Sequence, residues 1–487
     1  MKNKQLVTLC ILGAPVFLVS ACRQKNEPRP NIVLIIADDV SWDDLGCYGN
    51  MQVKTPNIDR LASQGIKFTN FFLTASSSSP SRNSIITGRY PHNTGAAELH
   101  TEPPLEMVSF PELLKQDGYF TAQAGKFHMG KYALRGFDIV HEKSEFNGDG
   151  GEEQWLTVLQ ARPKDKPFFM WFASYDAHRN WGPNEFSGTH TPATISPPFY
   201  LANGEKTKSD LAAYYDEIAR LDYYVGLVEK ELERQGVLDN TVILVMADNG
   251  RPFPHSKTRV NDRGMLTPFI IHWPAGIGRK QQDCASLVSA IDIAPTILEL
   301  ASSKVPESIQ GYSFKKVLYN PQKEFRNFVF SEHNWHDYEA HERMTRTKEF
   351  LYILNSRPQF ANMGPADAVG SPSFEDLVNL KINGTITTEQ ADIFTAPRPS
   401  EELYDCKKDS EQLINLVSDP EYQETLVSLR NSLKDWMGET GDDIPENLTK
   451  DWYLKESGYQ KTEYHGIRGE SVSKKMEATK NNNKGRF

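Results

Sequence analysis

Small polar side chains begin the segment from Ser78 to Arg89, which reads Ser-Ser-Pro-Ser-Arg-Asn-Ser-Ile-Ile-Thr-Gly-Arg. Proline and serine are typical first residues of a helix and glycine typically ends one, so we predict a helix from about Pro80 to near Gly88. Unpaired N–H groups and the positive dipole end at its start favour oxyanions, and Ser78 would lie beside them. A run of serines alone is equally typical of a polar surface loop.

Two pairs of oxygen-bearing side chains each follow an apolar run. Asp38-Asp39 comes directly after residues 32–37, and Asp248-Asn249 comes after residues 241–247. These donors, with no Cys or His among them, suit a hard cation, and we prefer Ca²⁺ to Mg²⁺ because clustered carboxylates in flexible geometry favour the larger ion. A salt bridge to Arg82 is the alternative for any one acid, and an isolated Asp pair can also cap a helix.

Four basic or hydrogen-bonding side chains also follow predicted strands or the second acid pair. Lys126 and His128 come after residues 118–124, His178 comes after residues 168–173, and Lys257 follows Asp248-Asn249. A lone histidine is more often structural than catalytic, and a lone lysine is usually solvated. The agreement between separate segments is what indicates a shared site.

The segments that must position these residues alternate between strands and helices. Continuous apolar runs at 32–37 and 241–247 are typical of strands buried on both faces of a sheet, and 268–273 is a further candidate. We predict a long helix from Leu211 to about Gln235 capped by Asp210, and another from Asp292 through Leu300. This pattern indicates an α/β fold with a large, mostly parallel sheet and helices on both faces. Ligands bind at the carboxyl ends of such strands, so the polar clusters are expected to form one site.

The pattern changes from about Phe325 onward. Strands are predicted at 327–330, 350–354 and 402–405, and a terminal helix near 422–437. We therefore predict a catalytic domain over 31–325 and a smaller α+β domain with an antiparallel sheet over 326–487. The Lys- and Asn-rich tail after about Lys474 is expected to be frayed.

Composition limits the classes of function. The 487 residues are 39% apolar and 24% charged, which is ordinary for a globular protein. The net charge of −10 argues against a nucleic-acid binder, and an anionic substrate would need a local basic pocket. Cys47, Cys284 and Cys406 are an odd number without metal-site spacing, so stability is expected to come from a core.

The N-terminus has the features of an export signal. Lys2 and Lys4 precede an apolar run from Leu6 to Val19 that is short for a membrane span. It ends in Leu-Val-Ser-Ala-Cys, which resembles a bacterial lipobox with Cys22 as the lipidated residue. We predict a lipoprotein signal peptide at 1–21, a tether at 22–30 and a membrane-anchored protein, periplasmic or associated with the outer membrane. A plain secretory signal cleaved near Ala21 is the alternative.

The spacing Ser-x-Pro-Ser-Arg-x-x-x-x-Thr-Gly-Arg resembles the signature of the formylglycine-dependent sulfatases. Gly-Lys-Phe-His-Met-Gly at 125–130 is similar to the family's Gly-Lys-Trp-His-Leu-Gly, and Asp-Asn-Gly at 248–250 followed by Lys257 is similar to its later motifs. Asp262 and Arg263 depart from the usual Glu-Gly, which affects a packing turn. The resemblance implies that a Ser-type sulfatase-maturing enzyme oxidises Ser78 to formylglycine.

The resemblance also implies a role for each matching residue. The hydrated formylglycine would lie on a cation held by Asp38, Asp39, Asp248 and Asn249 and would attack sulfur. Lys126 and Lys257 would neutralise the sulfuryl oxygens, His178 would protonate the leaving atom, His128 would help expel sulfate, and Arg82 would orient the nucleophile. An unmodified serine cannot perform the final elimination.

The substrate implied is a sulfated glycan. The segments around Asp248 and His178 look most similar to the heparan N-sulfatase branch, which cleaves the N-sulfate of glucosamine. Polar side chains expected either to bind sugar hydroxyls or to make contacts between domains are Glu98, His100, Glu332, His333, His336 and Asp337. Alternatives are an O-sulfatase for another glycan, a phosphonate or phosphodiester hydrolase of the same superfold, and an unmodified lipoprotein that only binds glycan.

Overall fold

The computed structural model describes residues 29–446, 448–452 and 476–487. The predicted signal peptide, Cys22 and most of the predicted tether therefore lie outside the described residues. Within them, no helix combines the length and apolar character needed to cross a membrane. Cys47, Cys284 and Cys406 are free thiols.

The large sheet has eight strands in the order β5-β4-β6-β1-β7-β8-β2-β9. Only β8 runs antiparallel to its neighbours, so the predicted mostly parallel sheet is confirmed. Its strands are β1 (Asn31–Ala37), β2 (Ile66–Phe68), β4 (Phe120–Gly125), β5 (Ile139–His141), β6 (Phe168–Ala173), β7 (Thr241–Ala247), β8 (Phe269–His272) and β9 (Gln282–Cys284).

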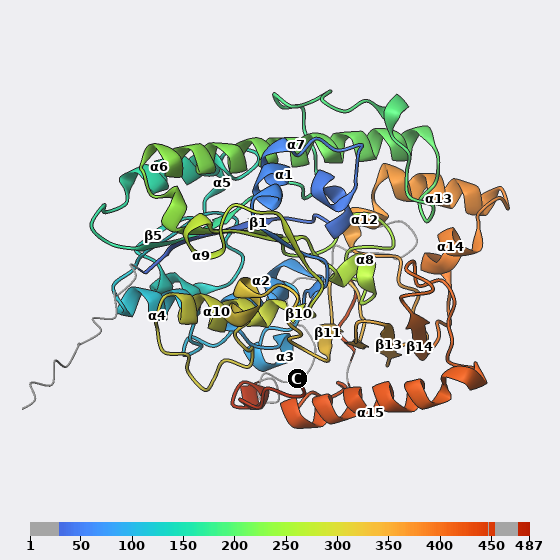
Figure 1. Cartoon of the computed structure of the whole chain (residues 1–487). Helices are drawn as coiled ribbons and strands as arrows, with labels where there is room; N and C mark the ends of the chain where they lie inside the picture. The colour runs from blue at the N-terminus through green and yellow to red at the C-terminus, as the bar shows by residue number, and fades with distance from the viewer. Residues whose placement is uncertain (1–28, 447, 453–475) are drawn as a thin grey trace, which may run out of the picture.

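Helices cover both faces of this sheet (Figure 1). One face packs against α1 (Pro56–Ser63), α6 (Glu153–Ala161) and α7 (Glu205–Arg234), and the other against α2 (Ser78–Thr87), α4 (Phe110–Gln116) and α10 (Ile293–Leu300). Successive residues of β1 point to opposite faces, so Leu34 joins one apolar core and Val33 the other. The continuous apolar run of β1 follows from this double burial.

The long helix α7 begins earlier than the sequence suggested. It starts at Glu205 after Gly204, so Asp210 lies inside the helix and the predicted cap is wrong. Asp210 instead accepts hydrogen bonds from Arg179 (Nη1–Oδ1, 2.7 Å) and Ser373 (Oγ–Oδ2, 2.6 Å). Asp210 therefore joins separate segments of the chain and does not initiate the helix.

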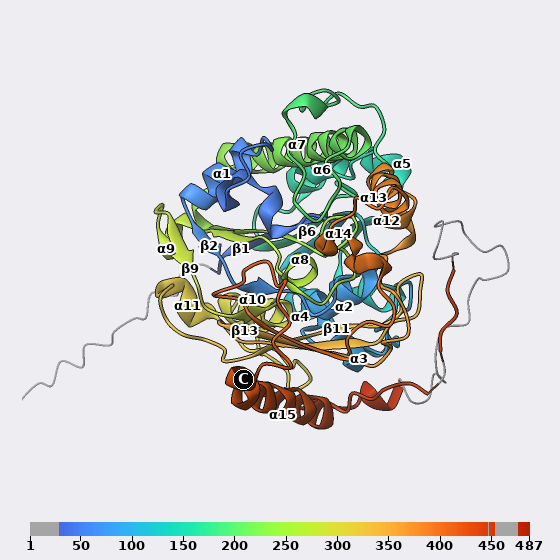
Figure 2. The ribbon, with the colours of Figure 1, turned by 90° about the vertical axis from the view of Figure 1, so that its right-hand side faces the viewer.

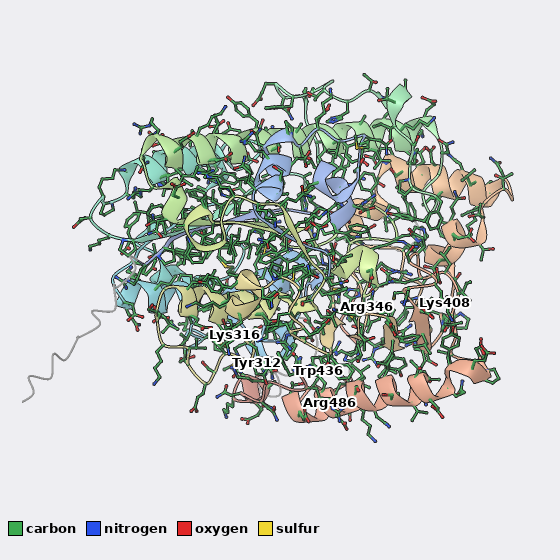
Figure 3. The ribbon with its side chains drawn as sticks, viewed as in Figure 1. Tyr312, Lys316, Arg346, Lys408, Trp436 and Arg486 are labelled. Carbon is green, nitrogen blue, oxygen red and sulfur yellow. The ribbon has the colours of Figure 1, made fainter. Side chains whose placement is uncertain are left out.

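A second, antiparallel sheet contains β11 (Val329–His333), β12 (Glu342–Arg346), β13 (Phe350–Asn355) and β14 (Glu401–Asp405). β12 separates the two strands predicted at 327–330 and 350–354. Its sequence, Glu-Arg-Met-Thr-Arg, is charged yet buried, because ion pairs satisfy its side chains. Helix α15 (Gln423–Thr440) covers this sheet (Figure 2), and its Trp436 stacks on Phe330 with ring centroids 5.0 Å apart; Trp436 is labelled in Figure 3.

The other strands and α-helices of the described residues are mostly short. They are β3 (Phe71–Phe72), β10 (Val288–Ser289), α3 (Pro91–Thr94), α5 (Ser144–Asn147), α8 (Asp262–Met265), α9 (Pro274–Ile277), α11 (Lys315–Tyr319), α12 (Ala366–Val369), α13 (Pro372–Ile382) and α14 (Thr388–Ala391).

Residues 476–487 pack against the body of the protein, so the prediction of a frayed tail is wrong for this part. Arg89, just after α2, is buried and donates to the carbonyl oxygens of Thr479 (2.9 Å) and Asn481 (2.7 Å). Gln310 donates to the carbonyl oxygen of Asn483 (2.7 Å). The polar tail is ordered because it satisfies buried donors of the large domain.

Candidate active site

Ser78 is the first residue of α2 and is buried. Its Oγ donates to Asn249 Oδ1 (3.1 Å) and Asp38 Oδ1 (3.3 Å), and it accepts from Lys126 Nζ (3.3 Å). The predicted helix is confirmed, starting two residues before Pro80 and ending at Gly88 in the left-handed conformation. Ser78 therefore lies where three separate segments meet at a helix N-terminus.

The acid pairs come together because their strands are neighbours. β1 and β7 pair in parallel with Ala37 opposite Ala247, so both strands end at the same level. Carboxylate oxygens of Asp38, Asp39 and Asp248 lie within 4.8 Å of one another. The sequence thus predicted correctly that these acids share the sheet edge with Ser78.

Three cationic side chains surround the acids. Arg82 Nε donates to Asp248 Oδ2 (2.8 Å), Lys257 Nζ donates to Asp39 Oδ2 (2.7 Å), and Lys126 forms an ion pair with Asp38. Burial alone would raise the pKa of Asp38, but Lys126 and other nearby cations hold it well below its usual value.

The donor set fits a hard divalent cation. Three buried carboxylates are joined by two neutral oxygens, Asn249 Oδ1 and Ser78 Oγ, which are the ligand types that Ca²⁺ prefers. Burial and the neighbouring Asp38 raise the pKa of Asp248 despite the attraction of Arg82. The salt bridge to Arg82 that was the alternative is present, and the oxygen cluster is present beside it.

His178 follows β6 and its side chain is partly exposed. Its Nε2 lies 3.9 Å from Asp39 Oδ2 and 3.7 Å from Asp367 Oδ2. Asp367, on α12, also accepts from Lys257 Nζ (3.0 Å). Sequence reasoning missed Asp367, because a single acid in a short helix more than a hundred residues from the last motif carries no local signal.

His128 is partly buried, and its Nε2 lies 2.7 Å from His100 Nδ1. Burial and Lys126 hold the pKa of His128 well below its usual value. The backbone N–H of His100 donates to Ser79 Oγ (2.8 Å), which ties this histidine pair to the start of α2. His336 approaches the same turn, with Nδ1 2.7 Å from Ser77 Oγ.

The remaining predicted sugar ligands lie elsewhere. His333 is buried with Nδ1 3.1 Å from Glu342, and Glu332 lies 2.8 Å from His92 Nδ1. Glu98 lines a separate cavity of about 390 Å³ and accepts from Thr449 Oγ1 (3.4 Å). A sugar-binding role for these side chains remains a prediction.

A cavity of about 420 Å³ opens in front of the site and is large enough for a sugar unit. Asp38 and Lys126 line it beside Ser78, and His178 lies at the same side. Asp176, Glu217 and other residues described below also line it.

Comparison with protein families identifies the family of the chain. A model described as Sulfatase matches residues 30–149 and 152–303, more than half of the chain. The chain belongs to the sulfatase family. A second model, the C-terminal part of N-sulphoglucosamine sulphohydrolase, matches residues 255–352 of this sulfatase. The class of activity of this protein is therefore that of a sulfuric ester hydrolase or sulfamidase.

Individual relatives resemble this sulfatase over most of its length. An ulvan-active sulfatase of Formosa agariphila is 30% identical over 89% of this chain and 79% of its own. Human N-sulphoglucosamine sulphohydrolase is 29% identical over 88% of this chain and 93% of its own. A solved structure of a protein in complex with its substrate D-glucosamine-2-N,6-O-disulfate has a TM-score of 0.66 at 23% identity, over 84% of this chain and 98% of its own, which shows the shared fold.

The departure from the family pattern at Asp262 has a structural explanation in this sulfatase. Both carboxylate oxygens of Asp262 accept hydrogen bonds from Arg346 of β12, each at 3.1 Å. Arg346 is labelled in Figure 3. The shorter acid therefore connects α8 to the small sheet, in keeping with the expectation that the change concerns packing.

Proposed function

We propose that this sulfatase removes the N-sulfate of glucosamine in heparin or heparan sulfate, with Ser78 oxidised to formylglycine. The observation that carries the proposal is the position of Ser78, at a helix N-terminus within hydrogen-bonding distance of Asp38, Lys126 and Asn249. The choice of glucosamine N-sulfate is supported by the matches to human N-sulphoglucosamine sulphohydrolase and to its C-terminal family model.

The formylglycine would supply a hydrated aldehyde as nucleophile, and Ca²⁺ at Asp38, Asp39, Asp248 and Asn249 would stabilise negative charge there. Lys126 and Lys257, which border these acids, bind and orient the sulfate oxygens.

His178 has the position required of the general acid. Its ring lines the cavity beside Lys126, and at 36% exposure it is more accessible than the Lys126 side chain at 14%. When the S–N bond breaks, the departing nitrogen takes a proton, and His178 Nε2 delivers it. Asp39 Oδ2 and Asp367 Oδ2 lie 3.9 and 3.7 Å from that nitrogen atom of His178.

The test is incubation with heparin disaccharides that carry a single N-sulfate or a single O-sulfate at a defined position. We expect sulfate release from the N-sulfated compound only, together with a free amine. Mass spectrometry of the Ser78 peptide, from protein made in its native host, should show the aldehyde. Release of O-sulfate alone would refute the N-sulfate assignment, and an intact serine with no turnover would favour a glycan-binding protein.

A second candidate is O-sulfate hydrolysis on another polysaccharide. Two relatives at 30% and 31% identity are ulvan-active sulfatases of Formosa agariphila. Ulvan oligosaccharides therefore belong in the same assay, and turnover of these in preference to heparin disaccharides would select this candidate.

We further propose that the protein is an exported lipoprotein, acylated at Cys22 and matured by a Ser-type enzyme. The apolar run and the Leu-Val-Ser-Ala-Cys sequence support this. Labelling of cells with a radioactive fatty acid should mark the wild-type protein and not Cys22→Ala. Equal labelling of both would exclude this anchor.

A further inference from the structure

The cavity in front of Ser78 has two chemically different sides. Lys126 and His178 line the side next to the nucleophile. A second group of lining residues, which we call the far wall, is joined by hydrogen bonds to one another and contains Asp176, Asn184, Glu217 and Arg220. The sulfate under attack belongs on the first side, so the far wall faces the rest of the substrate.

The guanidinium of the far wall is already occupied. Arg220 donates to both carboxylate oxygens of Asp176 (Nε–Oδ2 2.7 Å, Nη2–Oδ1 2.6 Å) and also to Glu217. The other carboxylate oxygen of Glu217 accepts from Asn184 Nδ2 (2.9 Å). Two of the three guanidinium nitrogens of Arg220, Nε and Nη2, are therefore engaged by acids of the protein itself, and Asp176 balances its charge.

Acids outnumber cations in this network. Glu152 is buried directly behind the wall, and among the described residues its Oε1 has no hydrogen-bond partner. A Cβ at Gly150 would lie 2.2 Å from Glu152, 2.6 Å from Arg220 and 2.8 Å from Asp176, so these side chains converge on one point. Burial and the neighbouring Asp176 raise the pKa of Glu217 to about 9. The surroundings that oppose ionisation of Glu217 would also oppose a sulfate or carboxylate brought by the substrate.

We propose that the far wall binds an uncharged, hydroxyl-bearing part of the sugar and rejects a second anionic group at that place. Carboxyl groups and the Asn184 amide can exchange hydrogen bonds with sugar hydroxyls, while an anion would be desolvated next to an excess of acid. The identity of the sugar rests on the proposed function, but the rejection of a second anion does not depend on which sulfate is cleaved.

Asn184 allows a direct test, because it is only partly buried and lies in an irregular segment that tolerates substitution. Asn184→Lys adds a positive charge to the far wall, and Asn184→Asp adds a negative one. For each variant, kcat/KM is measured on glucosamine N-sulfate and on the same sugar carrying a second sulfate at O3 or at O6. We expect the wild type to prefer the monosulfated sugar over at least one disulfated one. Asn184→Lys should shrink that ratio roughly tenfold, and Asn184→Asp should enlarge it.

Glu185→Gln is the matched control, since it changes the net charge by the same amount as Asn184→Lys at an exposed neighbouring position outside the cavity lining. Its ratio should equal that of the wild type. Equal ratios for all four proteins would overturn the proposal, as would a wild type that prefers both disulfated sugars. Identification of the released group tests the proposed function separately, because release of O-sulfate would refute the N-sulfate assignment. The ratios of kcat/KM on monosulfated and disulfated sugars would still test the far wall in that case.

Discussion

The acids at the ends of β1 and β7 are spaced like a second group of metal-ligand types, formed by His92, Glu332 and Asp442. In each group the possible ligand atoms lie within 4.8 Å of one another. In the second group, Arg343 donates to both oxygens of Asp442 (2.5 and 2.8 Å), and His92 Nδ1 lies 2.8 Å from Glu332. The charges of that group are therefore cancelled by its own members and by Arg343.

The pKa values of the two groups differ only in part, because in the first group Lys126 and other cations hold the pKa of Asp38 low against the effect of burial. Burial alone would raise the pKa values of Glu332 and Asp442, but His92 and Arg343 hold both below their usual values. Burial and Asp38 instead keep the pKa of Asp248 raised, even with Arg82 in contact. Spacing alone therefore does not identify a metal site; the neutral oxygen donors of Ser78 and Asn249 beside the first group distinguish it better.

The largest expected difference between the groups is catalytic, because only the first lies beside the proposed nucleophile. Ser78→Ala removes the hydroxyl group that the proposed oxidation would convert to an aldehyde, so sulfate release should fall roughly 10³-fold or more. The midpoint of thermal unfolding, measured on the same preparation, should stay close to that of the wild type. Activity within tenfold of the wild type would show that another residue is the nucleophile.

The second group should matter for stability instead. Asp442→Ala leaves the buried Arg343 guanidinium without its main partner and should lower the free energy of unfolding by about 3–5 kcal/mol. The folded-state pKa of Asp442 lies below its unfolded value, so its stabilisation is complete above about pH 4 and declines as the pH falls toward the folded pKa. The difference between wild type and variant in urea titrations should shrink accordingly below pH 4. Replacing Arg343 as well by Met should recover much of the loss.

Removal of Ca²⁺ should distinguish the groups directly. A ligand present at a hundredfold excess over its Kd stabilises the folded state by about 2.7 kcal/mol, so a chelator should lower the unfolding midpoint of the wild type and added Ca²⁺ should restore it. Asp39→Asn should weaken this response, and Asp442→Asn should keep it. A response that disappears in Asp442→Asn would place the ion in the second group.

The smallest effect is expected at Asp367, which lies beside the first group without belonging to it. Asp367→Asn removes a charge that contacts Lys257 and lies near His178, and kcat should fall by about tenfold while KM changes less. Asp376→Asn, in neighbouring α13, changes an acid bonded to Thr207 instead and should leave kcat unaltered. A change in KM alone would mean that Asp367 serves substrate binding.

The main sheet and the cluster around Ser78 were predictable because each motif directly follows an apolar strand. Once β1 and β7 are neighbours, Asp38 and Asp248 must meet. Contacts between distant segments could not be predicted in this way. Asp210 has the type of a helix cap but pairs with Arg179, and β12 has too many charges to be recognised as a buried strand. In both cases a tertiary ion pair overrides the local preference.

Hydrogen bonds from Arg89 to residues 476–487 join the turn after α2 to a segment far along the chain. The carbonyl oxygens of Thr479 and Asn481 lie nearly four hundred residues after Arg89 in the sequence. Burial lowers the pKa of this guanidinium to about 10, and these two oxygens are among its hydrogen-bond acceptors. Deletion of residues 476–487 would remove these acceptors from a buried cation and should therefore lower the free energy of unfolding.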